Sequence, residues 1–240
     1  MGVAWGLGAA LAAVVLFCFV PALADTEGPD THSFLAFGGT DLWRDGAFLY
    51  GGLLWSPGGL GADGFTLKLL LASGGYTYPS GGLHTEVDGT LVSGSALPGW
   101  RATRDRVTVS LYAGPIVQNY WLVPYDPGSR LRGFYGGAQF ASDIWYQPTP
   151  TSMIALNGTI ASIAAIGTMR VATGWQSFGP FFIGPEAQAL WCIDYQQWRA
   201  GVHITGFRFN GAEWTAATGW EVESFGRSGP YLRLGINVHY

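Results

Sequence analysis

The strongest constraint on the fold is an alternation of apolar and polar residues with a period of two. It is clearest at the C-terminus, where the apolar positions are Leu232, Leu234, Ile236, Val238 and Tyr240. The residues between them are Arg233, Gly235, Asn237 and His239. Successive side chains of a β-strand point to opposite faces, so this segment is predicted to be a strand with one apolar and one polar face.

Composition indicates that such strands face lipid. Only 12% of the 240 residues are charged, 48% are hydrophobic and 37 are glycines. Soluble domains carry about 25% charged residues, so this chain has too little charge to cover a water-facing surface. No run of 18 apolar residues follows Asp25, which argues against a helical membrane bundle. We therefore predict an all-β fold, a single antiparallel transmembrane β-barrel.

The alternating runs predict about twelve strands, each about ten residues long, which suffices to cross a bilayer when tilted. An even number of strands lets both termini of the chain face the periplasm. The predicted strands lie near residues 33–42, 47–55, 64–72, 83–92, 104–113, 131–142, 152–163, 166–175, 181–191, 198–209, 213–223 and 231–240.

Turn signals separate these runs. Asp45-Gly46 and Asn210-Gly211 predict two-residue hairpins, and the glycine-rich segments 57–59 and 80–82 predict further turns. The phase of the alternation slips beyond Gly206, which indicates a β-bulge. The segment from Gly114 to Arg130 contains three prolines and is expected to form a large loop, with room for a short strand.

The N-terminus is typical of an exported protein. Residues 1–20 are almost wholly apolar, and Ala22-Leu23-Ala24 has the small-x-small pattern of a signal peptidase site. We expect a signal peptide over residues 1–24, cleavage after Ala24, and a barrel over residues 25–240 in a bacterial outer membrane. No Lys or Arg precedes the apolar run, so an uncleaved anchor is the alternative. The processed chain would keep one cysteine, Cys192, and hence no internal disulfide.

Aromatic residues fall into two predicted groups. Trp and Tyr near strand ends are expected to form girdles at the membrane boundary, and these are Tyr50, Trp55, Trp100, Trp175, Trp198, Trp214 and Tyr240. A second group lies in predicted loops, where rings could stack on a glycan, anchor in the interface or pack within the loop. Its members are Tyr76, Tyr78, Trp121, Tyr125, Trp145 and Tyr146.

Polar residues on the opposite face from the apolar ones are expected to line the lumen, where they could form a path for a glycan. They are Lys68, His84, Glu86, Asp88, Arg106, Arg170, His203 and Glu221. Glu86 and Asp88 share one face of one predicted strand, a spacing that could in principle serve glycoside hydrolysis. A polar lining is the favoured explanation, because such a barrel needs inward polar residues in any case. A slip of one residue in register would invert every such assignment.

No other motif indicates chemistry. His32 and Ser33 are sequence neighbours on opposite faces of a strand, so they cannot readily share a hydrogen bond. The four histidines and two cysteines lack metal-ligand spacing, and segment 58–61 lacks the lysine of a phosphate loop. Without a basic patch, nucleic acid is an unexpected partner. We expect no catalytic residues, metal site or cofactor.

Several short motifs resemble the BcsS family of cellulose biosynthesis proteins. They are the segments 38–43 (GGTDLW), 50–52 (YGG), 63–68 (DGFTLK), 97–100 (LPGW), 184–186 (GPE) and 201–203 (GVH). The resemblance covers nearly all of the processed chain and implies an exported accessory component of cellulose production. The final strand also resembles that of outer-membrane proteins, which ends in an aromatic residue and is read by the barrel assembly machinery. That resemblance assigns an assembly signal to Leu232, Leu234, Ile236, Val238 and Tyr240.

These observations predict a non-enzymatic outer-membrane accessory of cellulose or exopolysaccharide secretion that either guides a glucan or acts as a scaffold. Its expected partners are outer-membrane lipid, the assembly machinery, and cellulose or other secretion components. The alternatives are a small-solute porin and a barrel enzyme acting on lipid or glycan. A twelve-strand barrel has a narrow interior, and if side chains fill it, a scaffold is favoured over a guide.

Overall fold

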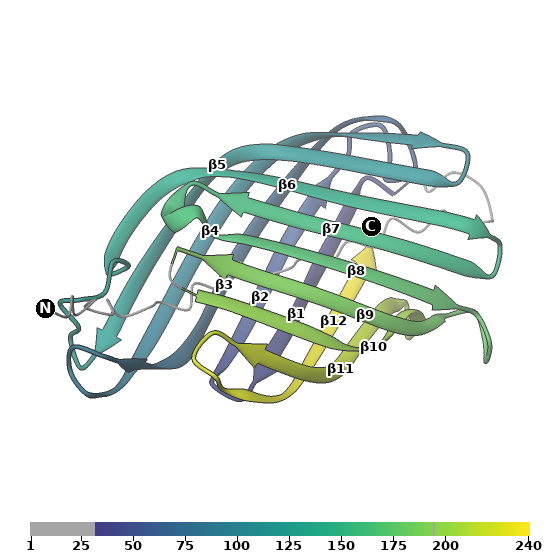
Figure 1. Ribbon diagram of the computed structural model, residues 1–240. Coiled ribbons are helices and arrows are strands. Elements are labelled where there is room, and N and C mark those ends of the chain that lie inside the picture. Colours follow the sequence, from purple (N-terminus) through teal and green to yellow (C-terminus); the bar gives the residue numbers. More distant parts are fainter. Residues whose placement is uncertain (1–31, 194) are drawn as a thin grey trace, which may run out of the picture.

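The computed structural model describes residues 32–193 and 195–240, so the predicted signal peptide lies outside the described residues. Twelve strands form a closed antiparallel barrel in which each strand pairs with its sequence neighbours and β1 pairs with β12 (Figure 1). The strands are β1 (Phe34–Trp43), β2 (Gly46–Trp55), β3 (Gly64–Ser80), β4 (Thr85–Arg104), β5 (Val107–Val123), β6 (Gly133–Thr149), β7 (Ser152–Ala161), β8 (Gly167–Trp175), β9 (Phe182–Cys192), β10 (Tyr195–Phe209), β11 (Ala212–Glu223) and β12 (Ser228–His239). Among the described residues, no helix is long and apolar enough to cross a membrane.

The predicted strand number and order are confirmed, but four strands are longer than predicted by five or more residues. β3, β5 and β6 have 17 residues each and β4 has 20. The prediction of a large loop over 114–130 is wrong, because β5 continues to Val123 and only residues 124–132 connect it to β6. Pro115 lies within β5 opposite Ala138, so the strand continues although proline lacks the backbone N–H that would donate to the neighbouring strand.

Two of the predicted turn features are confirmed and one is wrong. Asn210 and Gly211 have φ values of 53° and 74°, as a type I′ turn requires. The predicted bulge is present as a register shift between Ile204 and Phe207. The first hairpin instead turns at residues 44–45, and Gly46 already belongs to β2.

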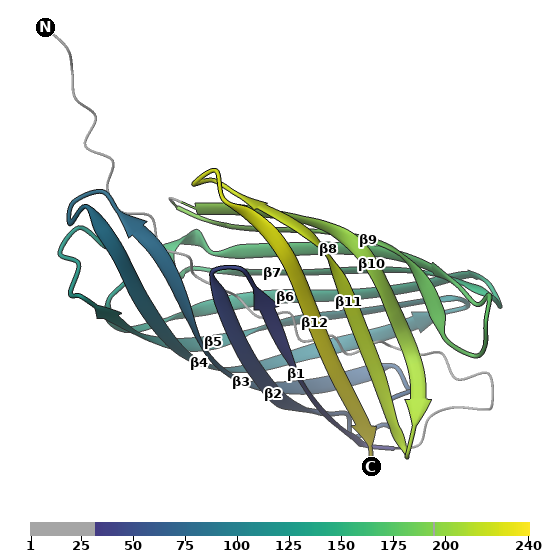
Figure 2. The same cartoon turned by 90° about the horizontal axis from the view of Figure 1, so that it is seen from below.

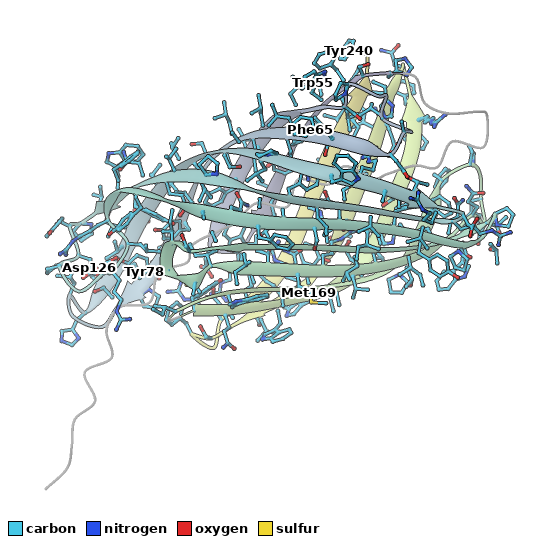
Figure 3. The ribbon with its side chains drawn as sticks, turned by 90° about the horizontal axis from the view of Figure 1, so that it is seen from above. Trp55, Phe65, Tyr78, Asp126, Met169 and Tyr240 are labelled. Carbon is cyan, nitrogen blue, oxygen red and sulfur yellow. The ribbon has the colours of Figure 1, made fainter. Side chains whose placement is uncertain are left out.

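The barrel has two distinct ends. Figure 3 places Trp55 and Tyr240 at one end, here called the terminus end, and Tyr78 and Asp126 at the other, the loop end. At the loop end, β3–β6 reach beyond their neighbours (Figure 2). This projection, residues 73–92 and 116–140, is called the lobe. A tilted strand crosses a bilayer with about 9–11 residues, so strands of 17–20 residues are long enough to extend past the lipid.

Glycine lets large rings fit inside this narrow barrel. Six inward aromatic residues lie directly opposite a glycine on the neighbouring strand. These pairs are Phe37–Gly52, Trp43–Gly46, Phe48–Gly74, Tyr50–Gly39, Tyr76–Gly89 and Tyr112–Gly99. A Cβ on any of these glycines would lie within 2.2–2.5 Å of a side-chain atom of the opposing residue, so each ring rests on bare backbone. The high glycine content therefore serves the packing of the interior.

The side-chain pattern changes along the barrel axis. Through most of the wall the outer face is apolar, as at Phe65, Leu69 and Leu71, while the alternate residues Thr66 and Lys68 are buried inside. In the lobe the arrangement is largely reversed, because most of its buried strand positions are apolar, with Gln118 and Gln139 among the exceptions, and much of its outer face is polar. A reversal of this kind is expected if the wall passes from lipid into water at the lobe.

Candidate functional site

The interior of the barrel carries a chain of buried ion pairs centred on Arg199 of β10. Its Nη1 lies 2.8 Å from both carboxylate oxygens of Asp41 on β1, and its Nε donates to Glu221 of β11 at 3.2 Å. Its guanidinium also lies 5.2 Å from the ring centroid of Trp43 and 5.1 Å from that of Tyr231. Strands β1, β10, β11 and β12 are thereby tied together inside the barrel.

A second group of buried charges surrounds Glu186 of β9. Its Oε2 accepts hydrogen bonds from Nε of Arg170 on β8 and from Nη2 of Arg233 on β12, both at 2.7 Å. Its Oε1 accepts from the hydroxyl of Tyr231 at 2.9 Å. Arg233 also donates to Gln188 at 3.0 Å. Because Tyr231 also faces Arg199, the two groups form one continuous polar network.

The opposite side of the interior has its own ion pair. Nζ of Lys68 on β3 donates to Asp143 of β6 at 2.5 Å, and Asp143 accepts from Asn157 of β7 at 2.9 Å. The ammonium group lies 4.3 Å from the ring centroid of Tyr112 on β5. Lys68 therefore fills the space between strands rather than lining an open channel.

Apolar side chains fill the interior at the loop end. Nineteen buried residues from ten of the twelve strands and from two connections form one cluster, here called the outer plug. Its members are Trp43, Phe48, Tyr50, Ala72, Tyr76, Tyr78, Val87, Leu91, Ile116, Tyr120, Leu131, Ala161, Ile163, Ile166, Leu190, Cys192, Tyr195, Ala217 and Tyr231. A packed cluster that draws on nearly every strand leaves little space for a continuous aqueous path.

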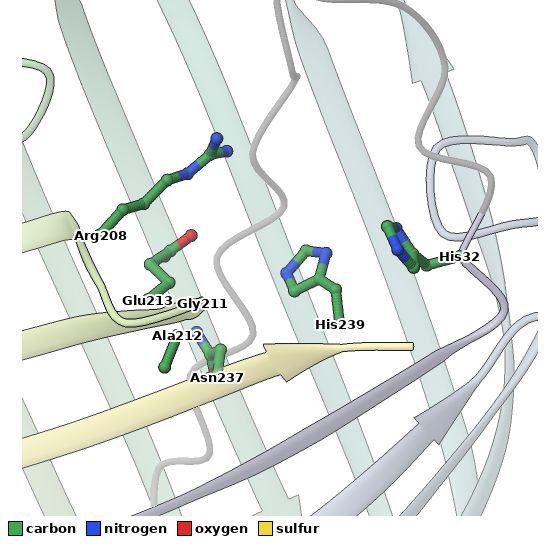
Figure 4. A pocket seen from close by; sticks show the side chains of 7 residues that line it. All are labelled: His32, Arg208, Gly211, Ala212, Glu213, Asn237 and His239. Atoms are coloured by element: carbon green, nitrogen blue, oxygen red, sulfur yellow. The ribbon is translucent and has the colours of Figure 1, made fainter.

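The terminus end contains a small pocket of about 260 Å³ between the β10–β11 turn and the end of β12. Glu213 and Asn237 are buried in its wall, and His32 and His239 meet edge to face with centroids 6.0 Å apart (Figure 4). Arg208 completes its polar lining. Within the described part of the chain, no group of three or more His, Cys, Asp or Glu residues is placed to hold a metal ion. The pocket offers hydrogen-bonding groups but no arrangement of a nucleophile and a base.

Comparison with protein families decides the classification. The profile of the family described as "Cellulose biosynthesis protein BcsS" matches residues 35–240. The chain belongs to the BcsS family. Membership assigns this BcsS-family barrel to an accessory role in cellulose biosynthesis and confirms the resemblance seen in its sequence. Comparison with curated protein sequences gives no match.

Solved structures resemble the BcsS-family chain in fold alone. LpxR from Salmonella typhimurium aligns with a TM-score of 0.50 and 11% identity over 87% of this chain and 100% of that chain. The KdgM porin gives a TM-score of 0.45 and 10% identity over 86% and 99% of the two chains. The translocator domain of the autotransporter NalP from Neisseria meningitidis gives a TM-score of 0.46 and 12% identity over 90% of each chain.

The structure of the BcsS-family chain separates the predicted lumen residues into two groups. Four of them are buried inside the barrel, namely Lys68, Arg170, His203 and Glu221. Lys68, Arg170 and Glu221 belong to the ion-paired groups described above. His203 instead contacts the carbonyl oxygen of Thr173 and the hydroxyl of Thr205, at 3.0 and 2.9 Å.

The lumen prediction is wrong for the other four residues. His84 and Arg106 lie in turns, and Glu86 and Asp88 point outward from β4. Apolar residues occupy the interior next to Glu86 and Asp88, since β4 passes the outer plug there. The carboxylate pair considered for hydrolysis therefore lies on the outer face of the lobe.

The loop assignment of five aromatic residues is wrong, because the strands are longer than predicted. Tyr76, Tyr78 and Trp145 are buried within β3 and β6. Trp121 and Tyr146 are exposed on the outer faces of β5 and β6. A sixth predicted loop aromatic, Tyr125, does lie in a connection and is exposed.

The outward residues of β12 follow the predicted phase. Leu232, Leu234 and Tyr240 are exposed, and Ile236 and Val238 are partly exposed on the same face. Six of the seven predicted girdle residues also lie on the outer surface. The exception is Tyr50, whose ring is buried opposite Gly39.

Four members of the interior network were not predicted from the sequence, namely Asp41, Glu186, Arg199 and Arg233. Each falls on a polar position of an alternating strand, which was an available signal. The pairing of these residues could not be predicted in this way, because the ion pair of Asp41 and Arg199 joins residues 158 positions apart in the sequence.

Proposed function

We propose that this barrel is a non-enzymatic outer-membrane accessory of cellulose or exopolysaccharide secretion that acts as a closed scaffold at the cell surface. The observation that carries the proposal is the filled interior, where the outer plug and the ion-paired network occupy the space a pore would need. A scaffold uses its outer surface and its ends to bind partners. Its partners in this proposal are other cellulose-secretion components or the glucan itself.

The outer surface supports insertion in lipid. Large apolar side chains are exposed all around the barrel, including Leu49, Leu71, Trp100 and Trp198. Soluble monomers rarely expose contiguous apolar surface on this scale. We propose that the chain is exported, cleaved after Ala24 and inserted by the assembly machinery through its last strand.

The porin alternative has less support. A channel that conducts small solutes needs a continuous wet path, and the buried residues of the outer plug have less than a tenth of their surface exposed. Guidance of a glucan through the barrel would need the same path. In this proposal a glucan contacts the outside of the barrel or its ends.

An enzymatic function also has less support among the described residues. Glu86 and Asp88 are exposed on the outer face of the lobe, and Asp88 accepts a hydrogen bond from Thr77 at 2.8 Å. Neither lies in a pocket that could hold a scissile bond. Changing Glu86→Gln and Asp88→Asn together should leave cellulose output unchanged, whereas a loss of output would favour catalysis.

Deletion of the gene tests the proposed function. Cellulose at the cell surface, measured by dye binding, should fall and should recover with the wild-type gene. Normal cellulose in the deletion strain would contradict the proposal. A second variant, in which a disulfide links two strands across the outer plug, tests the closed state. If the barrel is a closed scaffold, this variant should restore cellulose to the deletion strain as the wild type does. If the barrel opens to guide a glucan, the disulfide should prevent the recovery.

A further inference from the structure

The lobe rises above the part of the barrel that lipid can cover. Counted from the terminus end, Trp121 is the fifteenth residue of β5 and Phe134 is the sixteenth of β6. A tilted strand needs about 9–11 residues to cross the bilayer. Tyr125 lies farther along, in the connection after β5. On this count Trp121 and Phe134 lie at or beyond the outer edge of the apolar layer, and Tyr125 lies above them at the cell-surface side of the barrel.

These rings are exposed at the edge of a polar outer surface. Trp121 is 50% exposed, Tyr125 64% and Phe134 69%. Val123 is also exposed on the outer face of β5, whereas the outward residues on the adjoining face of β4 include Glu86 and Asp88. An exposed aromatic patch that is bordered by polar residues is typical of a binding site. The patch is here called the aromatic ledge.

Backbone pairing fixes the geometry of the ledge. Phe134 lies directly opposite Asn119 on β5, and Trp121 is two positions farther along the same face of β5. Diagonal neighbours of this kind are about 7–8 Å apart. Both side chains stand on the same face of a continuous antiparallel pair, so their rings project from a hydrogen-bonded wall.

The third ring is held by the connection between β5 and β6. The guanidinium of Arg132 lies 5.4 Å from the ring centroid of Tyr125. Arg132 is itself anchored, since its Nη1 donates to the carbonyl oxygen of Pro127 at 2.8 Å. The ledge is therefore largely formed before any ligand binds, which lowers the entropic cost of binding.

The chemistry of the ledge suits a neutral, flat polymer. A β-linked glucan presents C–H groups on the faces of its rings and hydroxyl groups at its edges. Aromatic rings can stack on the faces, and the neighbouring outward side chains of Thr90 and Asn119 can exchange hydrogen bonds with the hydroxyls. We propose that the aromatic ledge binds a β-1,4-glucan at the cell surface. This assignment rests on the proposed function, which supplies the class of polymer.

The test uses the full processed protein in detergent micelles, titrated calorimetrically with cellohexaose and incubated with amorphous cellulose. The ledge variant is Trp121→Ala with Phe134→Ala. Its matched control is Trp100→Ala with Trp175→Ala, two rings of similar exposure at the terminus end. Loss of two stacking rings should weaken binding about tenfold or more. The control should bind as the wild type does, and a linear α-linked glucan should not compete.

Equal binding by the ledge variant and the wild type would overturn the assignment, as would a wild-type protein that binds neither cellohexaose nor cellulose. Binding of lipopolysaccharide core sugars in place of the glucan would also overturn it. Heat-modifiable mobility on gels checks that each variant is folded. A ledge variant that restores cellulose to the deletion strain would refute a role of the ledge in output but leave the proposed function standing. Normal cellulose in the deletion strain itself would remove the proposed function, whatever the ledge binds.

Discussion

Arg199 on β10 and Asp41 on β1 are joined through the barrel interior, with Nη1 of the arginine 2.8 Å from both carboxylate oxygens. Two strands lie between β1 and β10 in the wall, so the pair spans the inside of the barrel rather than one strand-to-strand step. Both side chains are almost fully buried. Each charge therefore depends on the other for compensation, and the pair closes the interior as well as stabilising it.

Arg199→Met should lower the free energy of unfolding by about 3–5 kcal/mol, because it leaves the carboxylates of Asp41 and Glu221 buried without their cation. Denaturant unfolding from lipid vesicles, followed by tryptophan fluorescence, measures the change. Arg104→Met is the matched control, since the Arg104 side chain is largely exposed, and it should change stability by about 0.5 kcal/mol or less. Similar losses of unfolding free energy in the two variants would contradict the burial of the ion pair between Arg199 and Asp41.

Glu186→Gln should be equally damaging, at about 3–5 kcal/mol, because Arg170 and Arg233 share this one carboxylate. The same unfolding measurement applies. Adding Arg233→Met to Glu186→Gln removes one of the two uncompensated cations and should restore part of the loss. A double variant that is less stable than Glu186→Gln alone would argue against charge compensation as the cause.

Leu91 and Val92 test which side of β4 faces inward at the lobe. Leu91 is fully buried in the outer plug, whereas Val92 is 43% exposed on the outer face. Leu91→Ala should cost about 2–5 kcal/mol through the cavity it leaves, and Val92→Ala should cost much less. The reverse order of stabilities would show that the faces have been assigned the wrong way round.

Gly89→Ala tests the packing of rings on glycine. A Cβ at this position would lie 2.3 Å from the ring of Tyr76, which must then move. Overpacking of this kind costs about 1–3 kcal/mol. Gly82→Ala is the control, because its Cβ would have no atom within 4 Å. The combination of Tyr76→Ala with Gly89→Ala should show less than the sum of the two single effects, and strict additivity would contradict the contact.

Period-two alternation was enough to predict the strands, but it could not predict which face points inward at the lobe. Val87 has no exposed surface, whereas the side chain of its neighbour Glu86 is 65% exposed. The rule that apolar residues face lipid predicts the opposite. The rule applies only where the wall faces lipid, and where a wall rises into water the interior becomes the drier side. A sequence gives the alternation directly but not the height of each residue relative to the membrane.

The interior network shows a second limit. Arg170, His203 and Glu221 could be predicted as lumen residues because each is a polar residue at an alternating position within a strand. Their partners could not, since closure of the barrel and the stagger of its strands decide which side chains meet. The six ring-on-glycine pairs of the interior could not be predicted as pairs either, although the glycine content that makes them possible is evident from composition.

The central claim is that side chains close the interior of this barrel. Reconstitution of the purified, processed protein into planar lipid bilayers tests it most directly, with an outer-membrane porin as the positive control for insertion. We predict that inserted protein, verified by protease protection of the barrel, gives no steady ionic current. A stable ohmic conductance from the wild-type protein would contradict the closed interior and favour a pore.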